Sequence, residues 1–340
     1  MMAEAKPLFT RLQRVIIAGI LFCSSFILPA GTAGARIAQE KKTYTHTSLR
    51  AMARVYMASG SYDKAQPLLE AALDLAKTSN APDCDVCACA IDLAYLYKNQ
   101  GRLDEAETTC LSGLELQEKV YSPRHPFVSY TLRILGEIYR RQGRFREATD
   151  SLERAISIMC RVSGEDDPDM APVKVDMARL LVAKGEFAQA DSYFSEAIAL
   201  IEGSYGPTHL YTTRVLTSIA ELRVLQGRYA QAEALISRAL PIQEKIYGQN
   251  SHFLVPAWLV MANVYKSRGD LAKAKMLLAR SLSAAEKRPV SGRLIEVLEA
   301  LVQLHTETGS TKELTKLKQR IRKLRASNQY AYAATERSLQ

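Results

Sequence analysis

The sequence predicts an all-α protein, an α-solenoid of about seven helix-turn-helix hairpins that stack in a row. Two observations predict this fold class. A glycine recurs at an almost constant spacing, and small side chains recur at fixed distances on either side of it. The composition agrees, because 47% hydrophobic residues, 7% aromatics and only 17 glycines suit helices with one apolar face. A repeat array of 340 residues can form one continuous body.

The first 35 residues differ from the rest of the chain. Lys6, Arg11 and Arg14 precede an apolar run over 15–30, and small residues follow over 33–35. This pattern predicts a secretory signal peptide over 1–35, followed by a linker over 36–45. The run is shorter than the ~20 apolar residues of a spanning helix, so an uncleaved signal anchor is the alternative. We therefore expect an exported protein, periplasmic or secreted, or one anchored in a membrane by its N-terminal segment.

A glycine marks the turn of each predicted hairpin over 46–325. Successive glycines lie 41, 42, 42, 42, 42 and 40 residues apart, and similar residues follow each of them. Glycine permits the positive φ that a tight turn between two helices needs. The seven turn glycines are Gly60, Gly101, Gly143, Gly185, Gly227, Gly269 and Gly309.

Small residues flank each turn at matched heights. Their short side chains let two antiparallel helices approach closely, while large apolar residues at helical spacing fill the space around them. Seven positions before the glycine stand Ala53, Ala94, Gly136, Ala178, Ala220 and Ala262. Five positions after it stand Ala65, Ala106, Ala148, Ala190, Ala232 and Ala274. One hairpin cannot bury its apolar faces alone, so we expect neighbouring hairpins to complete the core.

This unit resembles the tetratricopeptide repeat (TPR). The segment Trp258-x-x-Met-Ala262-x-x-Tyr265, with Gly269-x-Leu-x-x-Ala274, matches that motif closely, whereas HEAT and armadillo repeats lack the Gly-x-aromatic-x-x-Ala pattern. The resemblance implies a right-handed superhelix whose first helices line a concave face. The period of 42 residues and loops such as Tyr205-Gly-Pro-Thr-His209 are similar to the kinesin-light-chain subtype, of which only the repeat is expected here.

The last unit departs from the pattern. Val302 and Leu314 replace its two small residues, which is typical of a capping repeat with a polar outer face. Its second helix, predicted over 311–325, combines an apolar stripe with seven lysines or arginines. We interpret it as a solvated cap, and contact with a membrane surface is the alternative. A flexible polar tail is predicted over 326–340.

The sequence contains no motif of a known catalytic or cofactor site. Glycine-rich phosphate loops, GxSxG and HExxH are missing, so we expect neither an enzyme nor a cofactor nor a bound metal. The Cys84-x-x-Cys87-x-Cys89 segment lacks the second ligand pair of a zinc site. A disulfide is expected among the first four of the exported cysteines, Cys84, Cys87, Cys89, Cys110 and Cys160, whose connectivity stays open; the odd count leaves at least one thiol unpaired or intermolecular.

The resemblance to TPR arrays also predicts which residues face a ligand. The concave positions lie 13, 10, 6, 3 and 2 residues before each glycine, and the expected peptide-binding residues are Arg50, Arg54, Lys98, Tyr130, Arg133, Glu137, Arg140, Arg141, Arg179 and Asn263. Guanidinium groups suit carboxylates, and the net charge is +9. We predict a non-catalytic scaffold for an extended, acidic protein segment, with no nucleic acid; solvated surface arginines are the alternative reading. The second hypothesis is a membrane-surface adaptor.

The carboxylate clamp of chaperone-binding TPR proteins is not expected in this chain. That clamp uses asparagines six positions before the turn glycine, and here only Asn263 occupies such a position.

Overall fold

The computed structural model describes residues 44–287, 292–309 and 311–327 of the chain. These residues contain fourteen α-helices, labelled α3 to α16, and no strand, which confirms the all-α prediction. They divide into two compact units between Leu96 and Tyr97, and each unit is described by itself. The predicted signal segment over 1–35, most of the linker, and the tail beyond Ser327 lie outside the described residues.

The helices follow one another as seven helix-turn-helix pairs. The first unit holds α3 (His46–Ala58), α4 (Tyr62–Thr78) and most of α5 (Asp83–Gln100), which continues into the second unit. The second unit continues with α6 (Leu103–Tyr121), α7 (Pro126–Arg141), α8 (Phe145–Ser163), α9 (Ala171–Lys184), α10 (Phe187–Tyr205), α11 (Leu210–Leu225), α12 (Tyr229–Tyr247), α13 (Val255–Ser267), α14 (Leu271–Glu286), α15 (Gly292–Glu307) and α16 (Thr311–Ser327).

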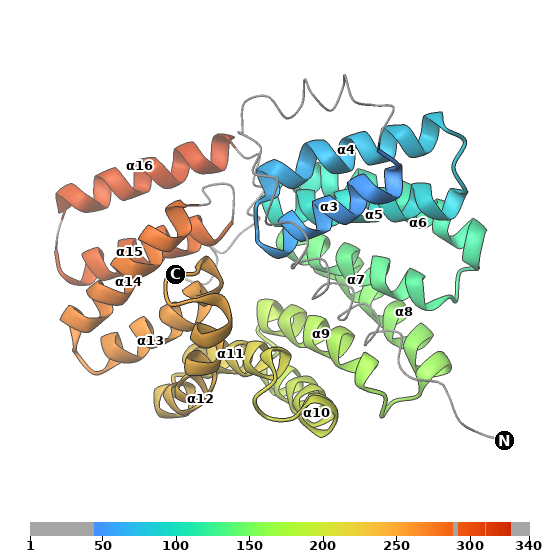
Figure 1. Ribbon diagram of the computed structural model, residues 1–340. Coiled ribbons are helices and arrows are strands. Elements are labelled where there is room, and N and C mark those ends of the chain that lie inside the picture. The colour runs from blue at the N-terminus through green and yellow to red at the C-terminus, as the bar shows by residue number, and fades with distance from the viewer. Residues whose placement is uncertain (1–43, 288–291, 310, 328–340) are drawn as a thin grey trace. The chain divides into compact units, whose positions relative to one another are not determined.

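Neighbouring helices pack in two ways. The two helices of a hairpin contact each other, as in α3 with α4 or α7 with α8 (Figure 1). In addition, the first helices of consecutive hairpins contact one another in the order α7, α9, α11, α13 and α15. These five helices, here called the inner row, form one continuous side of the second unit. Stacked hairpins thus bury each other's apolar faces, as the repeat pattern predicts.

The turn glycines behave as the sequence predicts. All seven have positive φ, between 71° and 82°. In the turn at Gly143, the Gly143 amide donates a hydrogen bond to the carbonyl of Arg140, and the Arg144 amide donates to the carbonyl of Tyr139. Such bonds satisfy the last carbonyls of the first helix before the chain reverses.

A second set of positive φ angles occurs where four of the second helices, α6, α8, α10 and α12, end. Gly164, Gly206 and Gly248 occupy this position in three hairpins, and Ser122 occupies it after α6 with φ 92° and ψ 153°. That region of backbone space is almost restricted to glycine. Ser122 therefore carries local strain that its glycine counterparts avoid.

Replacing Ser122 with glycine should stabilise the protein. Relief of the strained backbone is worth about 1–3 kcal/mol, and the greater freedom of glycine in the unfolded chain offsets about 0.5–1 kcal/mol of it. We expect a net gain of about 1 kcal/mol in the free energy of unfolding, measured by thermal or urea denaturation. The matched change Ser112→Gly, in the middle of α6, should instead destabilise by about 0.5–1 kcal/mol.

The small residues lie at the contact between paired helices. Ala53, Ala178 and Ala220 are fully buried before their turns, and the alanines five positions after the glycine are also buried. Gly136 on α7 is the tightest case, because a Cβ built on it would lie 2.7 Å from Leu152 Cγ of α8. The predicted close approach of the two helices is thus confirmed.

Ion pairs also connect consecutive second helices at a regular interval. Arg154 on α8 pairs with Glu118 on α6, and the equivalent pairs further along are Arg238–Glu202 (2.5 Å), Arg280–Glu244 (3.4 Å) and Arg320–Glu286 (2.8 Å). Between α10 and α8 the equivalent positions hold Glu196 and Cys160, and Glu196 pairs with Lys174 of α9 instead. Each exposed pair contributes only about 0–1 kcal/mol, so these pairs chiefly fix the alignment of the helices.

The last hairpin closes the apolar core of the second unit. Ile321 of α16 is buried in the cluster that contains Trp258, and Leu317 and Leu324 pack against it. The lysines and arginines of α16 from Lys312 to Lys323 are exposed, as expected for a cap with a polar outer face. Within the described residues, no helix combines the length and the apolar character needed to cross a membrane.

Candidate functional site

The candidate site lies on α7, α9 and α11 of the inner row. Arg133 of α7 donates a hydrogen bond from Nε to Asp176 Oδ2 of α9, over 2.8 Å. Both side chains are mostly buried, and within the described residues Arg133 makes no other hydrogen bond. Burial lowers the pKa of the guanidinium, but the nearby Asp176 more than compensates, so the pKa is raised and Arg133 is charged. Asp176 fixes the orientation of this guanidinium group, and its Nη donors stay available to another acceptor.

One helical turn further along α7, Glu137 forms ion pairs with two arginines. Arg140 donates to both of its carboxylate oxygens, at 2.8 and 2.9 Å, and Arg141 donates from Nε at 2.7 Å. Arg141 also donates to the carbonyl of Lys98, at 3.2 Å. Burial alone would raise the pKa of Glu137, yet the two guanidinium groups hold it well below its usual value. Glu137, which we predicted to face a ligand, thus holds the arginines in place.

Replacing Glu137 with glutamine should cost about 2 kcal/mol, because two half-buried arginines lose their shared carboxylate. A lowered pKa means that the unfolded chain binds the proton of Glu137 more tightly than the folded protein does. The stability from this carboxylate is therefore present above the usual pKa of about 4.5 and is lost as the pH falls below it. Urea denaturation between pH 3 and 7 should show a smaller acid-induced loss of stability for the variant than for the parent protein.

Another arginine, Arg179, lies on α9 near Asp176. Arg179 donates from Nη2 to Ser218 Oγ of α11, at 2.8 Å, and its Nη1 lies 4.0 Å from Asp176. Burial lowers its pKa, and Asp176 opposes that effect. The side chain of Arg214 of α11 is exposed and forms neither a hydrogen bond nor an ion pair with any residue in the described part of the chain, whereas its backbone carbonyl accepts from Ser218 Oγ at 3.5 Å. It nevertheless lies close enough to Arg179 to repel it electrostatically.

Tyr211 is the common neighbour of these arginines. Burial raises the pKa of its hydroxyl to about 12, while Arg133, Arg179 and Arg214 act in the opposite direction and Asp176 adds to the rise. The hydroxyl is therefore neutral and can donate a hydrogen bond at every physiological pH. We call Tyr211 with Arg133, Arg179 and Arg214 the arginine cluster.

The first unit repeats one element of this arrangement. Arg50 and Arg54 of α3 both donate to Asp92 of α5, with Nε–Oδ2 distances of 2.6 and 2.8 Å. The rule is common to both units: an arginine ten or six positions before one turn glycine bonds to the residue nine positions before the next. Asp92, Asp176 and Ser218 are those acceptors. These arginines therefore connect consecutive hairpins, which sequence reasoning did not predict.

The other predicted residues have different environments. Tyr130 of α7 is 44% exposed and suits contact with a partner. Lys98 is buried and lies near the Glu137 carboxylate. Asn263 of α13 donates its amide to the Leu259 carbonyl of its own helix, at 3.0 Å.

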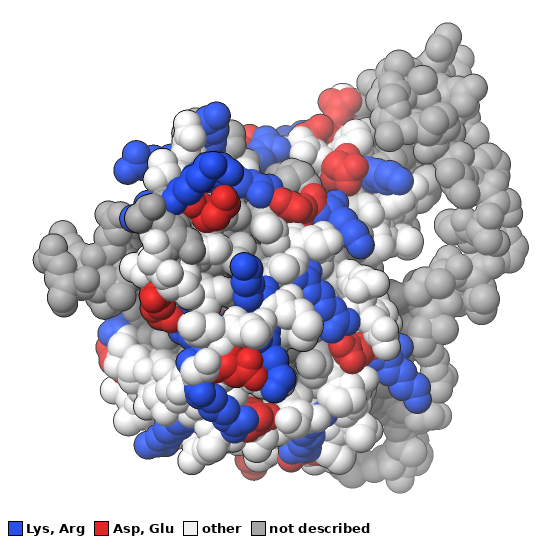
Figure 2. Space-filling view, turned by 90° about the vertical axis from the view of Figure 1, so that its left-hand side faces the viewer, with Lys and Arg blue, Asp and Glu red and all other residues white. Residues whose placement is uncertain are grey.

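Sequence reasoning missed Asp92 and Asp176 because we did not consider the position nine residues before each glycine. Glu221 of α11 lies six positions before its turn glycine, at one of the expected concave positions, and is half-buried. Burial raises the pKa of this carboxyl, although Arg293, Arg179 and Arg140 oppose that effect. Positive and negative side chains thus alternate, and Figure 2 shows the same mixture on the face in view.

The described residues offer little for covalent or metal chemistry. They contain no group of three or more potential metal ligands, and all five cysteines among them are free thiols. The disulfide that we expected is therefore not formed in this structure. Burial raises the pKa of Cys89 to about 11 and that of Cys110 to about 12, so neither is a thiolate near neutral pH.

The chain belongs to the tetratricopeptide repeat family. A profile of this repeat matches residues 85–161, 169–245 and 211–287, and a second profile matches 48–82. The matches confirm the repeat type that the glycine and alanine pattern predicts. The resemblance to the 42-residue kinesin-light-chain subtype stays a prediction. Among proteins with curated functions, none is significantly similar to this chain in sequence.

Several solved structures share the fold. A Rap protein complexed with the competence and sporulation factor aligns with a TM-score of 0.71 and 12% identity, covering 97% of this chain and 90% of that one. The Rap conjugation gene regulator of the plasmid pLS20, in complex with a Phr peptide, aligns with a TM-score of 0.66 and 12% identity over 98% and 89% of the two chains. The apo form of RapI aligns with 0.60 and 11% identity over 83% and 97%. At these identities the likeness concerns the fold alone.

Proposed function

We propose that the protein is a non-catalytic scaffold that binds an extended, acidic segment of another protein along the inner row. Membership in the TPR family supports the scaffold role. Of the Rap structures with the same fold, one was solved in complex with the competence and sporulation factor and another with a Phr peptide. The arginine cluster supports the choice of ligand. It combines three guanidinium groups and a neutral hydroxyl donor with two carboxylates, Asp176 and Glu221.

The geometry of the cluster favours carboxylates. Asp176 holds Arg133 and Ser218 holds Arg179, so an incoming acceptor meets donors whose orientation is already fixed. Less side-chain entropy is then lost on binding than with free arginines. Asp176 and Glu221 both act on Arg179 of the cluster. Glu137 also acts on Arg179 but is already bonded to Arg140 and Arg141. Three cations thus face two remaining carboxylates, so the local charge is positive and an acidic ligand is preferred. Tyr130 on α7 offers an exposed aromatic surface to an apolar side chain of the same ligand.

Arg214 allows a clean test, because its side chain forms no hydrogen bond or ion pair within the described residues whose loss would disturb the fold. A peptide rich in Asp and Glu, selected for binding to the full chain from a random library, is labelled, and its affinity is measured by fluorescence anisotropy. We expect the Arg214→Gln and Arg179→Gln variants each to bind it at least about 10-fold more weakly, in line with about 1.5–3 kcal/mol for a hydrogen bond to a charged group. Affinity should also fall as salt rises.

The matched control is Arg228→Gln, an exposed arginine at the start of α12. It removes the same charge from the chain and should leave the affinity unchanged. If the control weakens binding as much as Arg214→Gln does, the ligand responds only to net charge and the inner-row site is wrong. The same conclusion follows if neutral peptides of equal length bind as tightly as the acidic one.

A membrane-surface adaptor is the second candidate, and the exposed cations of α16 favour it. Ile321 faces the core, so this helix could meet an anionic surface only through its charges and not by inserting apolar residues. We also propose export, on the residue pattern over 1–35. Mass spectrometry of the mature N-terminus tests both ideas: a start at Arg36 supports export with removal of the anchor, and an intact Met1 contradicts cleavage.

A further inference from the structure

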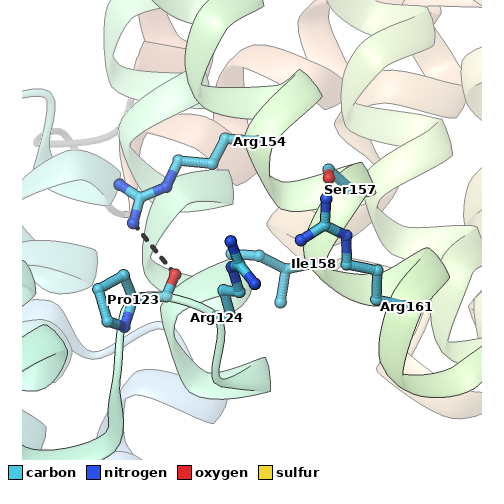
Figure 3. Close-up of a pocket in the computed structure, with 6 residues that line it drawn as sticks. All are labelled: Pro123, Arg124, Arg154, Ser157, Ile158 and Arg161. Carbon is cyan, nitrogen blue, oxygen red and sulfur yellow. Dashed lines mark hydrogen bonds between the residues drawn. The ribbon is translucent and has the colours of Figure 1, made fainter.

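A hollow of about 190 Å³ lies away from the inner row, between the loop after α6 and the outer side of α8 (Figure 3). Three of the six residues that line it are arginines. They are Arg124 from the loop and Arg154 and Arg161 from α8, and Pro123, Ser157 and Ile158 complete the lining. No carboxylate belongs to this set. The hollow is thus a concentration of positive charge with a hydroxyl group and a small apolar floor, since Ile158 is 4% exposed.

The three arginines differ in how they are held. Arg154 is fixed by Glu118 of α6 and by the carbonyl of Pro123, to which its Nη2 donates at 3.1 Å. Arg124 and Arg161 make no hydrogen bond or ion pair with any described residue. In Figure 3 the guanidinium groups of Arg124 and Arg161 lie on either side of Ile158. The Ser157 hydroxyl is drawn beside the guanidinium group of Arg161. Two cations that line the same hollow repel each other, and an anion between them removes that cost.

Comparison with the other repeats shows that this combination is specific to one place. At the position of Arg124 the next three repeats carry Asp166, Thr208 and Asn250, and at the position of Arg161 they carry Gly203, Lys245 and Lys287. The repeat scaffold itself therefore does not need these arginines. The Arg154 position, by contrast, holds the interhelical ion pair that recurs as Arg238–Glu202 and Arg280–Glu244. One arginine of the hollow belongs to the scaffold, and the other two are additions.

We propose that this hollow is a second binding site, separate from the inner row, which takes a phosphoryl group. Guanidinium groups from Arg124 and Arg161 supply paired N–H donors to a tetrahedral dianion, and the Ser157 hydroxyl supplies another. Arg154, held by Glu118, contributes positive charge at the edge. The volume exceeds that of a phosphate ion, so part of a molecule that carries the phosphoryl group also fits.

The test measures thermal unfolding of the full chain in inorganic phosphate and in sodium chloride at equal ionic strength. Phosphate should raise the midpoint more than chloride does, in a saturable manner, because a ligand that binds only the folded state stabilises it. Arg124→Gln and Arg161→Gln should each weaken the phosphate affinity at least 5-fold, and the double variant should abolish the difference between the two salts. Arg146→Gln, an exposed arginine on the same helix α8, is the matched control and should bind like the parent protein.

Two further arms locate the effect and its source. Arg214→Gln, in the arginine cluster of the inner row, should leave phosphate binding intact. Phosphate binding to the hollow can therefore be confirmed even if the inner row binds no acidic peptide. O-phosphoserine that binds more tightly than inorganic phosphate indicates a phosphoryl group on a protein partner, and equal or weaker binding indicates free phosphate. Equal midpoints in phosphate and chloride, or unchanged phosphate binding by the Arg124/Arg161 double variant, overturn the proposal.

Discussion

Replacing Trp258 with alanine should lower the free energy of unfolding by about 3–5 kcal/mol, the largest loss that we expect from one substitution. The Trp258 ring is fully buried in the core that α13, α14 and α15 share. Removing it leaves a cavity that rigid helices on several sides cannot close. Arg280 also stacks over the ring, with its guanidinium carbon 4.4 Å from the ring centroid, and would lose that contact.

The matched control for this substitution is Trp258→Phe. The indole Nε1 is buried and finds no hydrogen-bond partner among the described residues, so phenylalanine sacrifices no hydrogen bond. We expect it to cost no more than about 1–2 kcal/mol, from lost volume alone. Circular dichroism must report the unfolding of both variants, because Trp258 is the only tryptophan of the chain. Equal losses for the two variants would show that the indole makes a polar contact that the structure does not contain.

A valine at position 136 should destabilise the protein by about 3 kcal/mol through overpacking. Even the first carbon of a side chain on Gly136 would lie 2.7 Å from Leu152 Cγ and 2.8 Å from Cδ2, well inside contact distance. Valine adds two more carbons at the point where α7 and α8 are closest. The alanine variant should lose less, because the better helix propensity of alanine offsets up to about 1 kcal/mol of the clash.

A double-mutant cycle with Leu152→Ala identifies the cause of that loss. Leu152→Ala alone removes a buried side chain and should cost about 2–5 kcal/mol. If the clash is with Leu152, the double variant Gly136→Val/Leu152→Ala should be more stable than the sum of the two losses predicts, by at least about 1 kcal/mol. Urea denaturation followed by circular dichroism measures all four proteins. Additive losses would mean that valine acts on the α7 backbone and not on the helix contact.

The sequence was sufficient for the hairpins because their determinants are local. A turn needs its glycine within a few residues of the two helix ends, and a close helix contact needs small residues at fixed distances from that turn. Gly143, Gly136 and Ala148 meet both conditions within one short segment. The same residues recur in each repeat, so the period alone is enough to predict a stack of hairpins.

The site could be predicted only in part, because its interactions join different repeats. The distance between Arg133 and the turn glycine Gly143 predicted the helix on which Arg133 lies and the side of that helix that it occupies. Its bond to Asp176 depends on how α7 and α9 are aligned, which no single repeat specifies. The same holds for the hollow beside α8, where Arg124 and Arg161 lie 37 residues apart in sequence. For Asn263, too, the position before the turn glycine did not predict the bond that its amide makes to its own helix.

The cap at the end of the array has a consequence for how copies of this protein meet. A stack of similar hairpins has no inherent stopping point, because the apolar side of the last hairpin would accept another one from a second molecule. Here Ile321 faces inward, while Lys316, Lys318 and Arg322 occupy the outer side of α16. Stacking the first hairpin of a second molecule on this side would bury those charges at a desolvation cost, so the cap disfavours head-to-tail growth into filaments.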